Sequence, residues 1–388
     1  MLPIEAPPIE GGWVAIEGGV IRAVGSGRPP SGDITDLGDV AMLPGLVNPH
    51  THLELSWMRG LNPPSSSMNA WIRRLMTLRK EQSPPIDEQV RIAAMALDEA
   101  RASGTIAFGD ISNTLVTAEA LAATGTPSVI FHELLGFAPH DHDARAREGA
   151  DRAIASARPP LRAGLAPHAP YSTSPDLFQA IDREVTSRSL PSSVHLAESP
   201  EEMEFLRTGN GPIADTLREL GVWRDDWTPP GTGPVAYLDR LGVLKPGLLI
   251  VHATQLKRDA LATLAARRCV IVSCPRANQW IGNGNPPLDD FYASGCTVAF
   301  GTDSLASADT LDLLEELALA RRISTVPPSA LLRSATWAGA KALGLEDSYG
   351  RIAPGLRTPL LAVGVPSDVT DVEEYLVSGM PSERTWVG

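Results

Sequence analysis

Two histidines separated by one residue, His50 and His52, are the first residues in the chain whose type and spacing could do chemistry. They follow an apolar run, and residues 41–48 are predicted to form a short buried strand with a Gly/Pro break inside it. Side chains two residues apart leave a strand on the same face, so both imidazoles can point at one metal ion. A single His-x-His pair is weak evidence, because polar residues also end strands where nothing is bound.

Unusual side chains also end other predicted strands. His195 and His252 close two further apolar runs, and Asp303 follows the last one. Four of the eight histidines therefore fall at strand ends, whereas chance placement would scatter them over helices and surface. Imidazole and carboxylate are ligands that zinc and iron accept, so this set favours a metal site.

The elements that must position these residues alternate between short apolar runs and helix-length segments. Eight strands are predicted, over residues 41–48, 105–111, 128–134, 162–166, 193–197, 248–253, 270–273 and 297–301. The helices predicted between them include residues 87–102, 117–123, 175–187, 256–267 and 309–322. This alternation predicts an α/β protein in which residues 44–345 form a (β/α)8 TIM-like barrel. An open doubly wound sheet is the alternative, but no Gly-x-Gly-x-x-Gly follows the first strand.

Both ends of the chain have the composition of strands and turns. Residues 13–16 and 20–24 are separated by Glu17-Gly18-Gly19, which predicts a β-hairpin. We expect residues 1–43 and 346–388 to pair as one small β-sandwich domain built from both chain ends. Other expected elements are a helix at 213–220 followed by a loop over the barrel mouth, a helix at 329–343, and a solvent-exposed loop at 139–143.

Composition excludes several classes of partner. The 388 residues are 43% hydrophobic and 20% charged, which is ordinary for a globular protein. A formal net charge of −13 argues against nucleic acid and anionic membranes as partners. No apolar run approaches the ~20 residues that span a bilayer, and no secretory signal is expected at the start of the chain. Three cysteines are an odd number that suggests no disulfide framework, so we expect a cytoplasmic protein that acts on a small molecule.

Six motifs occur in a fixed order along the chain. They are Pro49-His50-Thr51-His52-Leu53-Glu54, His168-Ala169-Pro170-Tyr171, His195-Leu196-Ala197-Glu198, His252, Cys274-Pro275-Arg276-Ala277-Asn278 and Gly301-Thr302-Asp303-Ser304. This set resembles the metal-dependent amidohydrolase superfamily, in the branch of the cytosine, guanine and S-adenosylhomocysteine deaminases, and most of all the aminodeoxyfutalosine deaminases. The resemblance covers nearly the whole chain, including a β domain made from both ends, and it leaves a homodimer open.

The resemblance implies a role for each residue of a catalytic set. His50, His52, His195 and Asp303 would hold one divalent metal ion, zinc or alternatively iron, that acidifies a water molecule. Asp303 would also act as general base, and Glu198 would pass a proton to the ring nitrogen of the substrate. His252 would orient the water and stabilise developing charge.

A second metal ion is not expected. Two-metal members of the superfamily use a carboxylated lysine at the end of strand 4. The four lysines of this chain are Lys80, Lys245, Lys257 and Lys341, and none lies at a strand end between His52 and His195.

Substrate contacts are predicted from the same motifs. The resemblance places His168 and Ser304 against the substrate, and Trp71 could stack on a purine. Arg276, Arg59 and Arg73 are candidates to pair with a substrate carboxylate, because a guanidinium matches the geometry of that group. His132 and Glu133 begin like a zincin helix but lack the second histidine, and could instead line the barrel mouth.

The function predicted from the resemblance is deamination of an exocyclic amine on an adenine-type nucleoside, with 6-amino-6-deoxyfutalosine of menaquinone biosynthesis as the leading substrate. That substrate carries an aryl carboxylate. S-adenosylhomocysteine fits less well, because its ribose-binding pattern puts Glu nine residues after Trp, where this chain has Lys80 after Trp71. The alternatives are another heterocycle hydrolase of the branch (a guanine or cytosine deaminase, or a triazine hydrolase) and a catalytically silent scaffold.

Overall fold

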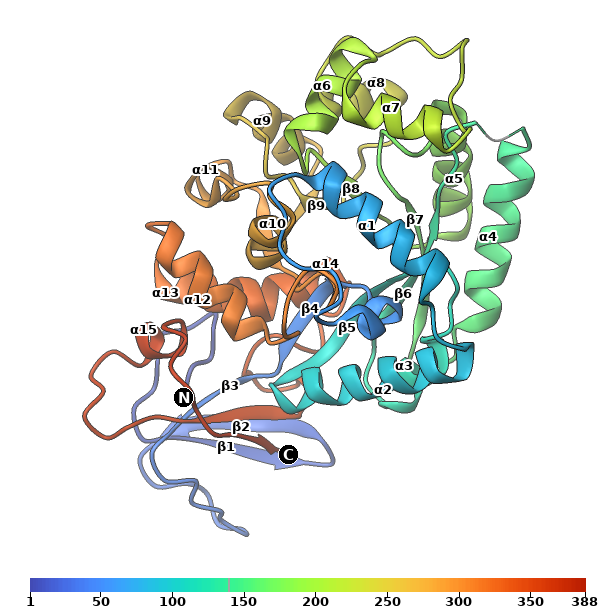
Figure 1. Ribbon diagram of the computed structural model, residues 1–388. Coiled ribbons are helices and arrows are strands. Elements are labelled where there is room, and N and C mark those ends of the chain that lie inside the picture. Colours follow the sequence, from blue (N-terminus) through green and yellow to red (C-terminus); the bar gives the residue numbers. More distant parts are fainter. Residues whose placement is uncertain (139) are drawn as a thin grey trace.

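Eight short parallel strands carry the residues predicted to do chemistry (Figure 1). The structure is a computed structural model that describes residues 1–138 and 140–388. One sheet contains β4 (Leu46–Thr51), β5 (Thr105–Ser112), β6 (Val129–Leu134) and β7 (Arg162–Pro167). The other contains β8 (Ser193–Leu196), β9 (Leu249–His252), β10 (Val270–Ser273) and β11 (Thr297–Phe300). The predicted α/β class with parallel sheets is confirmed.

The two parallel sheets touch along both of their outer strands. Isolated parallel bridges join Leu165 to Ser192, between β7 and the start of β8, and Thr51 to Asp303, between β4 and the residues after β11. At the second seam the backbone N–H groups of Thr302 and Asp303 both donate to the carbonyl oxygen of His50, at 3.1 and 3.2 Å. The first and last of the eight strands are thereby held side by side.

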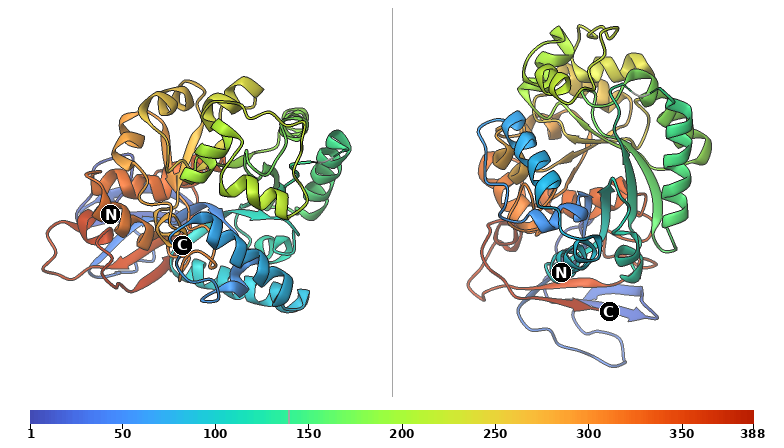
Figure 2. Two further views of the ribbon diagram at one scale, coloured as in Figure 1. Left: turned by 45° about the horizontal axis from the view of Figure 1, so that its top comes forward. Right: turned by 45° about the vertical axis from the view of Figure 1, so that its right-hand side comes forward.

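Helices surround the strands in both further views of the molecule (Figure 2). Two of them begin at a serine cap: Ser174 caps α5 and Ser199 caps α6, each followed by a proline in the first turn. The helices that alternate with strands β5 to β11 along the chain, or follow the last of them, are α2 (Ile86–Ala102), α3 (Ala118–Ala123), α4 (His142–Ser156), α5 (Pro175–Arg188), α9 (Arg258–Ala266), α10 (Pro275–Ile281), α11 (Leu288–Ala293) and α12 (Leu313–Ile323). A 3-10 turn (Leu53–Met58) and α1 (Met68–Glu81) follow β4, and α6 (Pro200–Thr208), α7 (Pro212–Glu219) and α8 (Pro234–Leu241) follow β8.

Several predicted elements need correction. The helix expected at 213–220 is α7, but the segment expected to be a loop after it also contains α8. The helix expected at 329–343 is divided into α13 (Pro328–Arg333), a π-helical turn (Ser334–Ala338) and α14 (Gly339–Ala342). The predicted loop 139–143 is shorter than expected, because His142 already begins α4; Pro139 of that loop lies outside the described residues.

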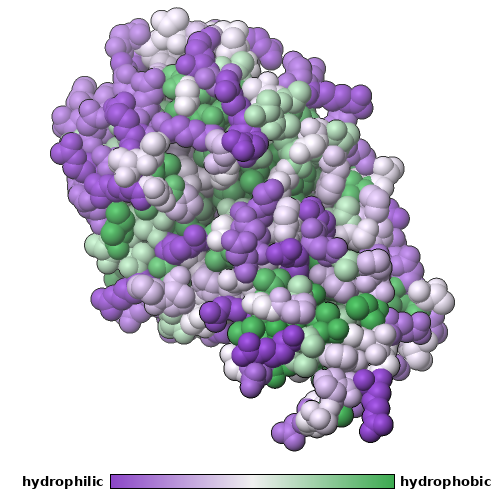
Figure 3. Space-filling model, turned by 180° about the vertical axis from the view of Figure 1, so that it is seen from behind, coloured by the Kyte–Doolittle hydropathy of each residue, from purple (hydrophilic) through white to green (hydrophobic). Residues whose placement is uncertain are grey.

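The two ends of the chain form two small antiparallel sheets. The hairpin β1 (Gly12–Glu17) and β2 (Val20–Ser26) turns through Gly18 and Gly19, which have φ of +59° and +72° and so use the backbone freedom of glycine. The other sheet has the order β13 (Arg384–Val387), β12 (Leu360–Gly364), β3 (Val40–Pro44), and α15 (Val372–Leu376) lies between its last two strands in sequence. Figure 3 shows the molecule from behind, with hydrophobic side chains gathered at the lower right, where these sheets lie.

The single strand predicted over 41–48 is wrong, because two strands occupy it. β3 ends at Pro44 and pairs with β12, whereas β4 begins at Leu46 and pairs with β5. Gly45 makes the change of sheet possible: a Cβ there would lie 2.4 Å from Cγ2 of Ile106. Both halves are equally apolar, so hydrophobic pattern alone cannot show that their partners differ.

Two sequence expectations concern the whole chain. Within the ranges 1–138 and 140–388, no helix is long and apolar enough to cross a membrane. Cys269, Cys274 and Cys296 are free thiols, the first two of them buried.

We predict that Gly109→Ala destabilises the fold. A Cβ at Gly109 in β5 would lie 2.2 Å from the carbonyl oxygen of Pro49, on the strand that carries His50, so one of the two strands must move. We expect a loss of roughly 1–3 kcal/mol in the free energy of unfolding, or more, measured by denaturant titration.

Gly233→Ala is the matched control. Gly233 has an ordinary φ of −70°, and the nearest atom to its added Cβ would be 3.9 Å away. We expect a change within about 0.5 kcal/mol. Equal stability of the two variants would contradict the tight β4–β5 contact.

Candidate active site

The predicted catalytic residues meet at the carboxyl ends of the parallel strands, where the backbone is locally unusual. Ala197, His252 and Asp303 have φ of +53°, +69° and +55°, a left-handed conformation that non-glycine residues rarely adopt. Hydrogen bonds hold two of these positions: Thr51 Oγ1 donates to the carbonyl oxygen of Asp303 at 2.9 Å, and His252 Nδ1 lies 2.9 Å from Asn278 Oδ1. Such strain persists only where the surroundings fix it, and it is common at functional sites.

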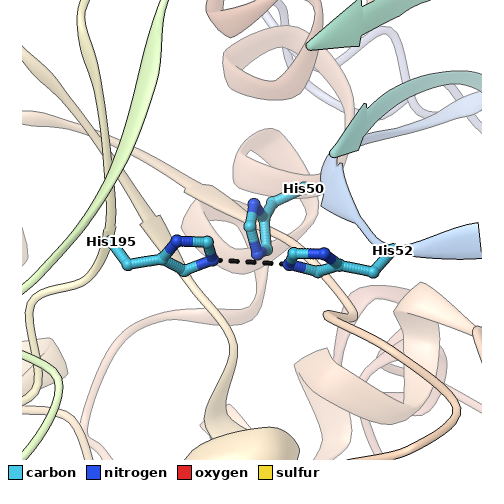
Figure 4. A group of neighbouring side chains, drawn as sticks. All are labelled: His50, His52 and His195. Carbon is cyan, nitrogen blue, oxygen red and sulfur yellow. Dashed lines mark hydrogen bonds between the residues drawn. The ribbon is translucent and has the colours of Figure 1, made fainter. Parts of the chain in front are cut away.

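Three imidazoles converge on one point (Figure 4). The ligating nitrogens of His50, His52 and His195 lie within 4.8 Å of one another, and Nε2 of His52 is 3.4 Å from Nε2 of His195. Burial, together with repulsion among the rings, lowers the pKa of His52 to about 3 and the pKa values of His50 and His195 well below their usual range. All three rings are therefore neutral at pH 7, the state in which imidazole binds a metal ion.

The donor set fits a divalent metal ion. Both ring nitrogens of His50 are buried without a hydrogen-bond partner in the described part of the chain. This state is costly, and a bound metal ion would relieve it at one of the two nitrogens. Asp303 Oδ1 lies 3.6 Å from Nε2 of His52 and 3.8 Å from Nε2 of His50. Asp303 Oδ2 accepts a hydrogen bond from Ser307 Oγ at 2.8 Å, which fixes the carboxylate. Three nitrogens and one oxygen around one point suit zinc.

Glu198 and His252 lie beside this group. Nε2 of His252 is 3.6 Å from Oε1 of Glu198, and the His252 ring stacks on the His195 ring with centroids 5.5 Å apart. Asn283 Nδ2 donates to Glu198 Oε1 at 3.1 Å. Burial, aided by repulsion from Glu201, raises the pKa of Glu198 to about 8. Glu198 is therefore mostly protonated at neutral pH and can donate a proton.

Glu202 positions Glu198, a role that the sequence did not suggest. The buried Glu202 carboxylate accepts hydrogen bonds from the backbone N–H groups of Ala197 and Glu198, both at 2.9 Å. It thereby fixes the left-handed turn at Ala197 that carries the chain from β8 to Glu198.

His52, His195, Glu198, His252 and Asp303 line a cavity of about 580 Å³, whereas His50 is fully buried and does not line it. Three residues predicted to contact substrate, Trp71, His168 and Ser304, line it together with Glu198 and His252. His168 is oriented by Ser172, whose Oγ lies 2.5 Å from its Nδ1. Its ring packs against His195, with centroids 5.0 Å apart.

The three arginines predicted as candidate substrate contacts lie outside this cavity, Arg276 among them. It does not line this cavity; its guanidinium contacts the Asp309 carboxylate and donates to the carbonyl oxygen of Thr310 at 3.1 Å. Arg59 and Arg73 do not line it either, because they pair with Glu99 and Glu219. The geometry therefore gives no support to these three arginines as substrate ligands.

Two further residues line the cavity: Glu133, which was predicted only as a residue of the barrel mouth, and Arg79, which was not predicted. Glu133, a candidate mouth residue, lies deep in the cavity, with Oε1 3.5 Å from Nδ1 of His195. Burial raises the pKa of Glu133 to about 8, and Asn113 Nδ2 donates to its Oε2 at 2.9 Å. Arg79 also lines the cavity. The only sequence signal for Arg79 is its spacing of seven residues from Ile72, which places both on one face of α1.

We predict that the protein purifies with about one equivalent of a divalent metal and that His195→Ala retains less than roughly half an equivalent. The variant loses one of three converging nitrogens. Metal content is measured by plasma mass spectrometry on protein prepared without chelators.

His142→Ala is the control, because His142 starts α4 and its Nε2 faces Asp176 at 3.6 Å, outside the group. It should keep the wild-type metal content. A full equivalent of metal in His195→Ala would show that these imidazoles do not form the site.

Comparison with known proteins identifies the family. A profile of the amidohydrolase family matches residues 41–374. The chain is 32% identical over 319 residues to an aminodeoxyfutalosine deaminase of Deinococcus radiodurans, covering 79% of this chain and 74% of the relative. It is 29% identical to a 5-methylthioadenosine/S-adenosylhomocysteine deaminase of Pelotomaculum thermopropionicum, covering 91% and 80%.

A solved structure agrees. An adenosine deaminase of Xanthomonas campestris with bound zinc superposes with a TM-score of 0.81 and 26% identity, covering 97% of this chain and 86% of that one. Since the family profile spans most of the chain and the relatives match along most of their length, the protein belongs to the amidohydrolase family and is a hydrolase that acts on carbon–nitrogen bonds.

Proposed function

We propose that this protein is a mononuclear metal-dependent deaminase that replaces the exocyclic amine of an adenine-type nucleoside with oxygen and releases ammonia. One observation carries the proposal: three neutral imidazoles, Asp303 and a protonated Glu198 lie together, and all of them except the fully buried His50 line a single cavity. The relatives named as nucleoside deaminases support the same substrate class.

We also infer the architecture that supports this chemistry. The two parallel sheets would close into one (β/α)8 barrel of residues 44–345, which the bridges at both seams favour. Residues 1–43 and 346–388 would form a small β-sandwich. Apolar packing of Ile21 with Leu356 and Leu360, between segments from opposite chain ends, supports this arrangement.

The metal ligands in this proposal are His50, His52, His195 and Asp303. The ion would be zinc, with iron as the alternative, and when bound it supplies a Lewis acid that makes water a better nucleophile at neutral pH. Asp303 accepts the proton that the attacking water loses as its oxygen bonds to the amine-bearing ring carbon. The cavity, the free cysteines and the absence of a membrane-crossing helix in the described residues are in keeping with action on a small molecule in the cytoplasm.

Glu198 and His252 complete the reaction. Protonated Glu198 gives its proton to the neighbouring ring nitrogen, which draws electrons from the ring and makes the carbon easier to attack. His252 orients the attacking water through Nε2, which accepts a hydrogen bond from it because the N–H of the neutral ring is at Nδ1, facing Asn278 Oδ1. Asp303 then gives the proton that it took from water to the exocyclic nitrogen. As the carbon–nitrogen bond breaks and ammonia leaves, the new hydroxyl group becomes a carbonyl and its proton returns to Glu198.

The leading substrate is 6-amino-6-deoxyfutalosine, an intermediate of menaquinone biosynthesis. It is supported by the relative from Deinococcus radiodurans and by Lys80, which replaces the glutamate expected for S-adenosylhomocysteine. Deamination of 5-methylthioadenosine or S-adenosylhomocysteine is the second candidate, because relatives of that name match over 91% of the chain.

A panel assay tests the proposal. Ammonia release is measured with 6-amino-6-deoxyfutalosine, adenosine, 5-methylthioadenosine, S-adenosylhomocysteine, guanine, cytosine and a chlorotriazine. Turnover of an adenine nucleoside supports the proposal. Turnover confined to the triazine or the free bases overturns it, and no turnover by metal-replete protein favours a silent scaffold.

We predict that kcat/KM is flat through neutral pH and falls as the pH rises through about 8. The active form of Glu198 is the protonated one, and its pKa is raised, so activity is present below that pKa and lost above it. Glu198→Gln should lower kcat by about 10²- to 10⁴-fold and remove this alkaline limb.

Two neighbours sharpen the test. Glu201→Gln should move the alkaline limb to lower pH, because repulsion from Glu201 helps to raise the pKa of Glu198. Glu204→Gln, an exposed change on the same helix, should leave the profile in place. An alkaline limb that survives in Glu198→Gln would rule out Glu198 as its source.

A further inference from the structure

One face of α1 lines the cavity over most of the helix length. Met68, Ile72, Leu75 and Arg79, spaced by three or four residues, all face it. At one end Met68 lies beside Asn283, which holds Glu198; at the other Arg79 approaches Asn113. At 1.5 Å per residue, Met68 and Arg79 are about 16 Å apart along the helix axis. The cavity therefore extends well beyond the reacting ring.

The far part of the cavity is apolar at its rim. Met76 and Leu135 line it and are each 37% exposed, and Leu220 of the segment after α7 is 47% exposed. Leu75 and Leu217 extend the same wall inward. A ligand arm that passes along this wall would bury apolar surface, so an apolar arm is favoured.

The acidic residues that line the cavity are buried, and the basic ones are exposed. The acidic residues that line it, Glu133, Glu198 and Asp303, are all buried at its base. The charged lining residues that are exposed are Arg79 and Lys80. In a chain with a net charge of −13, these two exposed cations favour an anion beside them in the cavity.

The guanidinium of Arg79 has no close acceptor among the described residues for most of its N–H groups. Its contacts within residues 1–138 and 140–388 are long: 3.4 Å to Asn113 Oδ1 and 3.9 Å to Glu54 Oε1. Glu54 Oε2 accepts hydrogen bonds from the hydroxyl groups of Ser112 and Thr114, at 2.7 and 2.6 Å, and Glu54 Oε1, the atom that faces Arg79, accepts one from the backbone N–H of Asn113 at 3.0 Å. Both oxygens therefore have closer donors than Arg79. By contrast, Arg59 pairs with Glu99 at 2.5 Å.

We propose that Arg79, with Lys80 beside it, binds a carboxylate at the end of an apolar arm of the nucleoside and thereby sets substrate preference. The inference rests on the proposed deaminase function and deepens it. A planar guanidinium can hold both carboxylate oxygens at once, which a single ammonium cannot. An arm that ends in both an ammonium and a carboxylate fits less well, because the exposed charged residues of the described lining are both cationic.

The test compares an adenine nucleoside that carries a benzoate on its 5′ arm with the methyl ester of the same compound. The readout is the ratio of kcat/KM for the acid to kcat/KM for the ester, in wild type, Arg79→Met, Arg79→Lys and Arg59→Met. Arg59 is the matched control, because its side chain is 40% exposed against 41% for Arg79, yet it lies outside the cavity. Thermal melting of each variant establishes that it is folded.

We expect wild type to prefer the acid and Arg79→Met to lower the ratio by about 10- to 100-fold, the worth of a hydrogen bond to a charged group. Arg79→Lys should fall between them, and Arg59→Met should keep the wild-type ratio. An unchanged ratio in folded Arg79→Met overturns the assignment while leaving the deaminase proposal intact. No deamination of either compound or of adenosine by metal-replete wild type would overturn both.

Discussion

The candidate site depends on the seam where the first parallel strand meets the end of the last. There the carbonyl oxygen of His50 accepts hydrogen bonds from the N–H groups of both Thr302 and Asp303. This backbone contact joins residues about 250 positions apart in sequence and brings the Asp303 carboxylate to within 4 Å of the His50 and His52 rings. Without it, the His50 and His52 nitrogens and the Asp303 oxygens would belong to separate edges of two sheets.

Burial then gives these donors their chemistry. Removing the histidines from water disfavours their charged forms, and removing Glu198 from water disfavours its carboxylate. The same physical cause therefore leaves bases with free lone pairs and an acid with a proton to give. Hydrogen bonds from Asn283 to Glu198 and from Ser307 to Asp303 aim these groups without reversing the effect of burial.

Much of the site could be predicted because its signals are local. Strand ends can be recognised from apolar runs, and parallel strands bring their carboxyl ends to one edge, so His50, His52 and His195 could be expected to meet. Arg276 could not be judged in this way. Its side chain is drawn to Asp309 and Thr310, and sequence pattern does not show which partner an arginine selects.

Arg79 and Gly45 are residues whose roles could not be predicted, because these roles depend on how elements pack together. Arg79 reaches the cavity only because α1 lies across it, and the placement of a helix over the carboxyl ends of the parallel strands is a matter of tertiary packing. Gly45 lies with Pro44 inside an apolar run that was predicted to be one strand, and its importance appears only when β3 and β4 are seen to join different sheets. Local pattern identifies elements well but leaves open which neighbours they pair with.

The pairing of β3 with β12 also affects how the chain can fold. The paired residues are about 320 positions apart in sequence, so this part of the small sheet cannot form until a long intervening stretch of chain is available. Until then the apolar strand β3 lacks its partner, and an unpaired strand edge is the kind of surface that recruits chaperones or aggregates. Contacts of such long sequence separation are slow to form, so closure of this sheet is what removes that hazard.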